Sequence, residues 1–281
     1  MPAFEPIVGR YFTMEVAGKP CRIYAEEAGQ GIPLVCLHTA GSDARQFRHL
    51  LCDPKVTEQY RVIAFDLPWH GKSNPPPGFR EHEYKLTTDL YKEIVMSFCA
   101  AYELNSPVVM GCSMGGRVVL HLALEQASYF RAVIALEGAD KLEPYYGLDW
   151  LHRPDVHGGE VASAFVSAQV APQSPDEFRW ETLWHYMQGG PGIFKGDLHF
   201  YWHDGDFDER SPLIDTKQCP VYLLSGEYDS SCTPERTQAT AARIRGSSAT
   251  IMAGMGHFPM SENPKLFATY IQPVLHEIAA A

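Results

Sequence analysis

One serine lies between two apolar runs in residues 107–124, PVVMGCSMGGRVVLHLAL. A strand that ends in a tight turn and re-enters the protein as a helix lifts the turn residue above the sheet edge, which requires small neighbours. Gly111 and Gly115 flank Ser113 at the spacing that such a turn needs. The helix that follows would direct free N–H groups and its positive dipole end at the serine. The stretch therefore predicts a strand–turn–helix unit with Ser113 as a nucleophile.

Short apolar runs alternate with helical patterns along most of the chain. Strands that are apolar on both sides suit a parallel sheet covered by helices on each face. We therefore predict an α/β fold with a doubly wound, mostly parallel sheet and helices on both faces. The expected strands lie at 33–37, 61–65, 108–110, 132–136, 221–224 and 249–252, after an N-terminal hairpin of 11–16 and 21–26, and the expected helices at 43–51, 87–102, 115–126, 234–244 and 264–278.

The alternation breaks between residues 140 and 216, a segment rich in aromatic residues and without a convincing buried strand. Open α/β sheets bind their ligands at the carboxyl ends of the strands. We therefore expect residues 141–215 to form a helical lid over that edge. The α/β core would then consist of residues 1–140 and 216–281.

The acidic composition of the chain argues against partners that carry a negative charge. The 281 residues carry 34 acidic and 23 basic side chains, and the formal net charge of -11 would repel nucleic acid and anionic membranes. The N-terminus does not resemble a signal peptide, and the seven cysteines are far apart. These features predict a cytoplasmic protein with reduced thiols and no nucleic-acid or membrane partner. A homodimer is compatible with them.

Five stretches resemble the α/β-hydrolase superfamily, and the likeness extends from Tyr11 to Ile278. They are LVCLHTAGSD, RVIAFDLPWHGKS, GCSMGG, LLSGEYD and GMGHFPMSENP. The resemblance implies a catalytic triad of Ser113, Asp229 and His257, in the family's order of nucleophile, acid and histidine. His257 also follows the last strand in a glycine-rich loop, where a base beside the serine is expected.

Other site residues follow from the same resemblance. Glu137 corresponds to a position at which some relatives place the acid, and it stays open as the alternative to Asp229. The oxyanion hole would use the N–H groups of Met114 and Ala40. Thr39 replaces the usual glycine after His38, and its β-branched side chain disfavours a positive φ. We predict a substrate pocket that includes Thr39, Trp69, Trp184, Trp202 and Phe258.

The segment HDGDFDER spaces Asp204, Asp206 and Asp208 like the start of a calcium loop. An EF-hand would next require glycine at position 209 and a bidentate glutamate at position 215, which are Glu209 and Asp215 here. We read this segment as a solvated loop and expect neither a metal nor a cofactor.

Together these residues predict a cofactor-independent serine hydrolase that cleaves a small hydrophobic carboxylic ester or lactone through an acyl-enzyme. Two alternatives remain. Related lidded hydrolases cleave a carbon–carbon bond in a dienoate or diketone, although the loop HTAGSD departs from their usual oxyanion sequence. A hydrolase-like receptor could instead hold a small molecule and recruit a partner when its lid closes.

Overall fold

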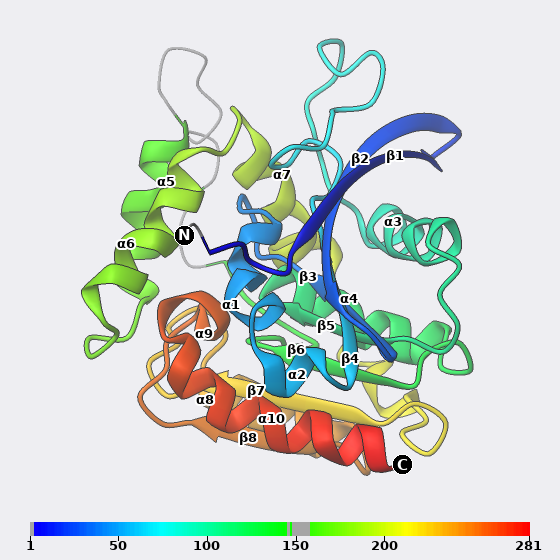
Figure 1. The fold of residues 1–281 in the computed structure, drawn as a ribbon, viewed down its shortest axis with the longest axis vertical. Coiled ribbons are helices and arrows are strands. Elements are labelled where there is room, and N and C mark those ends of the chain that lie inside the picture. The colour runs from blue at the N-terminus through cyan, green and yellow to red at the C-terminus, as the bar shows by residue number, and fades with distance from the viewer. Residues whose placement is uncertain (1–2, 145–146, 148–157) are drawn as a thin grey trace.

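The computed structural model describes residues 3–144, 147 and 158–281, and within them one sheet of eight strands forms the centre of the molecule (Figure 1). The strand order is β1-β2-β4-β3-β5-β6-β7-β8, in which β1–β2 and β2–β4 are antiparallel and every other pair is parallel. The predicted mostly parallel sheet is therefore confirmed. Its strands are β1 (Val8–Val16), β2 (Lys19–Gly29), β3 (Ile32–Leu37), β4 (Tyr60–Phe65), β5 (Val108–Cys112), β6 (Ala132–Leu136), β7 (Val221–Gly226) and β8 (Ser248–Met252).

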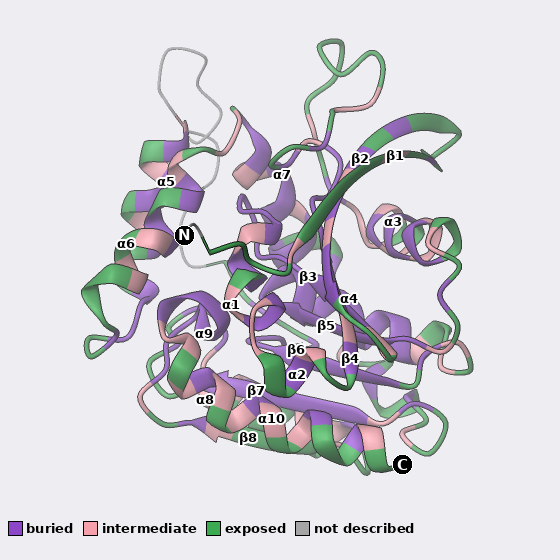
Figure 2. Ribbon diagram, viewed as in Figure 1, coloured by how far each residue is buried: buried purple, intermediate pink, exposed green. Residues whose placement is uncertain are grey.

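Helices cover both faces of the sheet, as the doubly wound prediction requires. On one face, α3 (Thr88–Ala101) and α4 (Met114–Glu125) pack against strand residues such as Val35 and Val109. On the other, α1 (Arg48–Leu51), α2 (Pro54–Thr57) and α10 (Pro264–Ala280) pack against Leu34 and Val108. Because successive strand side chains point to opposite faces, both must be apolar, and Figure 2 shows the central strands buried.

The described part of the segment between β6 and β7 consists of helices joined by turns and loops. It contains α5 (Gly158–Val166), α6 (Asp176–Met187) and α7 (Ile193–His199), and no strand among the residues that are described there. Helices α5 and α6 lie side by side (Figure 1) and share a small apolar cluster with Phe258, which follows β8. Residues 145–146 and 148–157 of the predicted lid lie outside the described residues, and the boundaries 141–215 stay a prediction.

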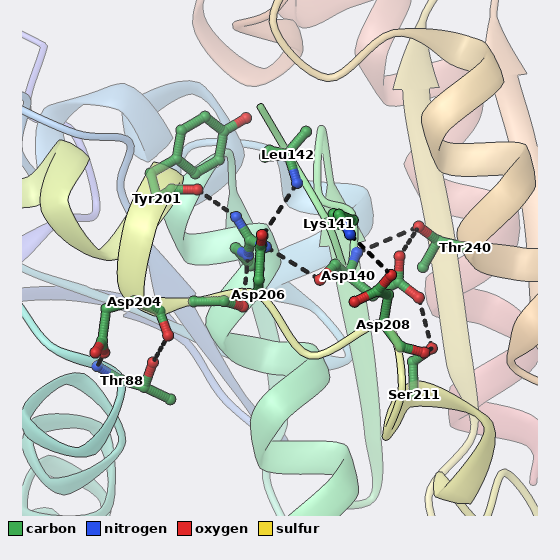
Figure 3. A network of polar contacts seen from close by, with 12 residues as sticks. Thr88, Asp140, Lys141, Leu142, Tyr201, Asp204, Asp206, Asp208, Ser211 and Thr240 are labelled. Carbon is green, nitrogen blue, oxygen red and sulfur yellow. Dashed lines mark hydrogen bonds and ion pairs between the residues drawn. The ribbon is translucent and has the colours of Figure 1, made fainter. Parts of the chain in front are cut away.

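The acidic run near residue 206 ties this insertion to the core (Figure 3). Each aspartate has a partner outside the run: Asp204, Asp206 and Asp208 contact, in that order, Thr88, Arg117 and Lys141. The guanidinium of Arg117 is fully buried and also donates to the carbonyl oxygens of Tyr201, Gly205 and Asp140. Since Arg117 belongs to α4, these bonds fasten the end of the insertion to the helix that follows Ser113.

Two further helices complete the second half of the chain. Helix α8 (Pro234–Arg243) follows β7, and the short α9 (Pro259–Glu262) precedes α10. Across the residues that the structure describes, none of the helices has both the length and the apolar character needed to cross a bilayer.

Candidate active site

Ser113 occupies the turn between β5 and α4 with strained backbone angles. Its φ of 59° and ψ of -115° lie in a region that non-glycine residues rarely adopt. The serine N–H donates to the carbonyl oxygen of Leu136 at 2.9 Å, which fixes the turn against β6. Strain of this kind persists only where the surrounding structure imposes it, and it is concentrated at functional sites.

The glycines around Ser113 are required by close backbone contacts. A Cβ atom on Gly111 would lie 2.3 Å from the carbonyl carbon of Gly115. A Cβ atom on Gly115 would lie 2.6 Å from the carbonyl oxygen of Leu37, at the end of β3. Helix α4 therefore begins directly against the ends of its neighbouring strands, and any larger residue at either position would push the turn outward.

His257 and Asp229 meet at the same edge of the sheet. Asp229 follows β7 and His257 follows β8, and the Nδ1 atom of His257 lies 2.7 Å from Oδ2 of Asp229. The other carboxylate oxygen accepts the N–H groups of Ser231 at 2.7 Å and Cys232 at 3.0 Å. Both side chains are buried. This pairing fixes the ring so that Nδ1–H faces the carboxylate and Nε2 is left to act as a base.

A small cavity joins Ser113 to His257. Its volume is about 10 Å³, which is room for about one water molecule, and its described lining is mostly apolar or aromatic. Ser113, His257 and Ala40 contribute from the core, while the insertion contributes Val166, Gln169, Tyr186, Phe194, Leu198 and Tyr201, and Ser231 completes the wall. Ser113 and His257 therefore line the same narrow cavity, which is where an acyl group would have to react.

Two backbone N–H groups are available near the turn. The N–H of Met114 opens α4, and the N–H of Ala40 lies in the loop after β3; neither donates a hydrogen bond to any described residue. Ala40 lines the cavity. Free donors at the start of a helix and in a neighbouring loop are the elements of an oxyanion hole, which stabilises the charge of a tetrahedral intermediate.

Thr39 fits into this loop because the residue that needs a left-handed backbone conformation is not Thr39. Gly41, rather than Thr39, has the positive φ, of 70°. The N–H and hydroxyl groups of Thr39 both donate to Oε1 of Gln46 at 3.1 Å. The N–H of Gly41 donates to the buried carboxylate of Asp197 in α7 at 2.7 Å. The loop that carries Ala40 is thus held on both sides.

Comparison with known proteins agrees with this geometry. The model of the "Alpha/beta hydrolase family" matches residues 34–269, which is most of the chain. The chain belongs to the alpha/beta hydrolase family. Among solved structures it is similar to a thermophilic esterase from Thermogutta terrifontis, with a TM-score of 0.81 at 20% identity, covering 96% of this chain and 99% of the other. This likeness confirms the fold predicted from the sequence.

Curated relatives of this alpha/beta hydrolase carry different names. The chain is 34% identical over 229 residues to a magnesium-chelatase 30 kDa subunit of Rhodobacter capsulatus, covering 76% of each chain. It is 22% identical to a 2-hydroxy-6-oxo-6-(2'-aminophenyl)hexa-2,4-dienoic acid hydrolase of Metapseudomonas resinovorans, covering 86% of this chain and 83% of the relative. The family is therefore established, whereas the substrate is not.

The predicted pocket residues require correction, because none of the five is among the described residues that line the cavity of this hydrolase. The side chain of Trp184 is directed to solvent, with 59% of its surface exposed. Trp202 and Phe258 are buried in apolar clusters, and Thr39 is buried against Gln46 and Tyr186. Trp69 contacts Phe79 and Tyr84 beside a separate surface groove.

Tyr186 of α6 lines the cavity but was not among the predicted pocket residues, and the helical spacing of α6 explains why. Helix α6 turns Thr182, Leu183 and Tyr186 inward, and Trp180 and Trp184 outward. The spacing of i, i+1 and i+4 among the inward residues is helical and was available in the sequence. Choosing Trp184 by ring size, rather than by this spacing, selected the exposed face of α6.

Glu137 lies beside the histidine and Asp229 and raises the question of a metal site. One ligand atom from each of the three residues can be chosen so that all lie within 4.8 Å of one another. However, Nδ1 of His257 and Oδ2 of Asp229 are only 2.7 Å apart, which is a hydrogen-bond distance and leaves no room for an ion between them. The arrangement suits proton sharing better than coordination.

Proposed function

We propose that the chain is a cofactor-independent serine hydrolase that cleaves a small hydrophobic carboxylic ester or lactone through an acyl-enzyme. The observation that carries the proposal is the cavity shared by Ser113 and the Asp229-bound His257. A serine hydroxyl is a weak nucleophile at neutral pH, and it becomes effective when an oriented imidazole accepts its proton.

In the first half of the proposed reaction, Ser113 Oγ attacks the substrate carbonyl while Nε2 of His257 takes the hydroxyl proton. The imidazolium is stabilised by Asp229 through the 2.7 Å contact. The N–H groups of Met114 and Ala40 bind the oxyanion, and loss of one such donor costs about 2.7–4 kcal/mol of transition-state stabilisation. Collapse of the intermediate expels the alcohol, which receives the proton from His257.

In the second half, water attacks the acyl-enzyme, and His257 acts again as base and then as acid. The helical insertion would serve as a lid that excludes bulk water from this step. Walls formed by Val166, Phe194 and Leu198 favour an apolar acyl or alcohol group, and the narrowness of the cavity favours a small one.

The proposal is tested with p-nitrophenyl esters of graded chain length. We expect a burst of nitrophenol followed by steady turnover, and Ser113→Ala should lower the rate by several orders of magnitude while circular dichroism stays native. A rate that survives Ser113→Ala would move the nucleophile elsewhere. Ligand binding without any burst or turnover would favour the receptor alternative.

A carbon–carbon hydrolase is the second candidate, since one relative is a hydrolase of a hexadienoic acid. That reaction must also bind a carboxylate and a dienol, for which the described cavity offers the polar groups of Gln169, Tyr186 and Ser231. Turnover of a ring-fission dienoate at a higher kcat/KM than any ester of the series would favour this candidate over the esterase.

A further inference from the structure

The carboxyl group of Glu137 lies directly beside the acid of the proposed triad. It comes from the residue after β6, which has a positive φ of 51°, and its side chain is fully buried. One carboxyl oxygen of Glu137, one of Asp229 and a ring nitrogen of His257 all lie within 4.8 Å of one another. Two buried carboxyl groups this close repel each other when both are ionised, which favours a state with one proton between them.

The surrounding donors decide where that proton resides. Asp229 accepts three hydrogen bonds, from the ring of His257 and from the N–H groups of Ser231 and Cys232, and all three favour its ionised form. Glu137 receives the single N–H of Gly226, which lies 2.9 Å from both of its oxygens, and a contact from the Ser225 hydroxyl. The hydroxyl of Ser225 is also directed to the carbonyl oxygen of Cys232 at 3.1 Å.

Fewer donors and complete burial thus place the proton on Glu137. Burial, followed by the charge of Asp229, raises the pKa of Glu137 well above its ordinary range. The other titratable groups that face this carboxyl pair come from β5, the loop after β7 and α9. They are Cys112, Cys232 and Glu262, and burial raises the pKa of each of them as well.

We propose that Glu137 is a positioning residue for the triad: a neutral carboxylic acid that donates a hydrogen bond to Asp229 and holds its carboxylate toward His257. This inference rests on the proposed serine-hydrolase function and extends it. A donor on Asp229 draws negative charge away from the carboxylate, so the imidazolium is stabilised less.

The kinetic test compares two substitutions of Glu137. Glu137→Gln keeps a neutral N–H donor, and Glu137→Ala removes it. We expect Glu137→Ala to lower kcat about tenfold and to move the acid limb of the kcat/KM profile upward by about half to one pH unit. Glu137→Gln should recover most of the lost kcat and return the acid limb to its original position. A purely structural side chain would lower stability in both variants and leave the acid limb in place.

Two results would overturn the inference while leaving the serine mechanism intact. If Glu137 were itself the ionised acid, Glu137→Gln would lower turnover by about 10⁴, as loss of the orienting carboxylate does in related triads. The second result is spectroscopic and does not depend on Glu137→Ala folding. At pH 8.5 the infrared spectrum should contain a protonated-carboxyl band that Glu137→Gln removes and Glu262→Gln retains; absence of that band in the unmodified protein contradicts the proposal.

A different result would reject the proposed serine-hydrolase function. If Ser113→Ala keeps full activity, the nucleophile is wrong, whereas the infrared band of Glu137 would be unaffected by that outcome. The two ideas can therefore be rejected separately.

Discussion

The phenol of Tyr186 donates a hydrogen bond to the hydroxyl oxygen of Thr39. The direction follows from the proton of Thr39, which is directed to Oε1 of Gln46 at 3.1 Å. Tyr186 belongs to α6 in the insertion, and Thr39 precedes Ala40, whose N–H is proposed for the oxyanion hole. One hydrogen bond thus joins the insertion to the loop that we propose stabilises the transition state, and it uses the residue that replaces the family's usual glycine.

This contact predicts that Thr39 and Tyr186 act as a pair. Thr39→Val removes the hydroxyl at nearly constant shape, and Tyr186→Phe removes the phenol. Since a hydrogen bond of this kind contributes about 0.5–1.5 kcal/mol net, each variant should lower kcat by roughly threefold to tenfold. The double variant should lose no more than either single one, because the lost interaction is the same.

The measurement is a double-mutant cycle on kcat with a short p-nitrophenyl ester. Thr39→Ser keeps the hydroxyl and serves as the control, for which we expect activity close to that of the unmodified protein. Losses that simply add in the double variant would mean that the two side chains act independently of each other.

A second prediction concerns the acid of the triad. Asp229→Asn should lower turnover by about 10⁴, because an asparagine that retains the Ser231 and Cys232 contacts favours the wrong tautomer of His257. Turnover is measured together with the thermal melting temperature, so that a folding defect is recognised. A loss below tenfold, with the fold intact, would show that another carboxyl group orients the imidazole.

The walls of the cavity give a third prediction, about substrate size. Phe194 lines the cavity, and a Cβ atom on Gly41 would lie 2.8 Å from its ring, so the ring fills the space beside the oxyanion loop. Phe194→Ala should raise the ratio of kcat/KM for a hexanoate over an acetate ester by about tenfold. Trp184→Ala is the matched control: its ring is 59% exposed, and the ratio should stay unchanged.

Much of the fold and of the site geometry could be predicted from the sequence because it depends on local patterns. The central strands are apolar on both faces, which already implies a sheet covered on both sides. Once the sheet is parallel, residues that follow its strands meet at one edge, and Ser113, Asp229 and His257 each follow a strand. Their proximity needed no knowledge of side-chain packing.

The cavity lining could not be predicted in the same way because it depends on contacts between distant segments. Tyr186 faces inward because α6 packs on Phe258, which comes after β8 and is remote in sequence. Gly41 takes the left-handed conformation that the family resemblance suggested for position 39. Trp69 has a positive φ of 80° despite its bulky side chain, and local sequence preferences do not favour this conformation.

The last prediction concerns stability in acid and the buried residue His121. Its Nε2 atom lies 2.9 Å from the carbonyl oxygen of Gly205, and its Nδ1 atom has no hydrogen-bond partner among the described residues. Burial lowers the pKa of His121 from 6.5 to about 4. The unfolded chain therefore binds a proton at this residue at a higher pH than the folded protein does. The stability that neutral His121 provides is complete above pH 6.5 and is lost as the pH falls toward 4.

His121→Gln removes this titration while keeping a donor for Gly205. The free energy of unfolding is measured by urea denaturation at several pH values. In both proteins it should fall between pH 6.5 and pH 4, and the drop in His121→Gln should be smaller than the drop in the unmodified protein by about 3 kcal/mol. His276→Gln alters an exposed histidine and should leave the pH dependence unchanged. Because burial also lowers the pKa of His38 and His185 to about 4, part of the acid sensitivity should persist in His121→Gln. An identical pH dependence in His121→Gln and the unmodified protein would mean that His121 is protonated in the folded state without penalty.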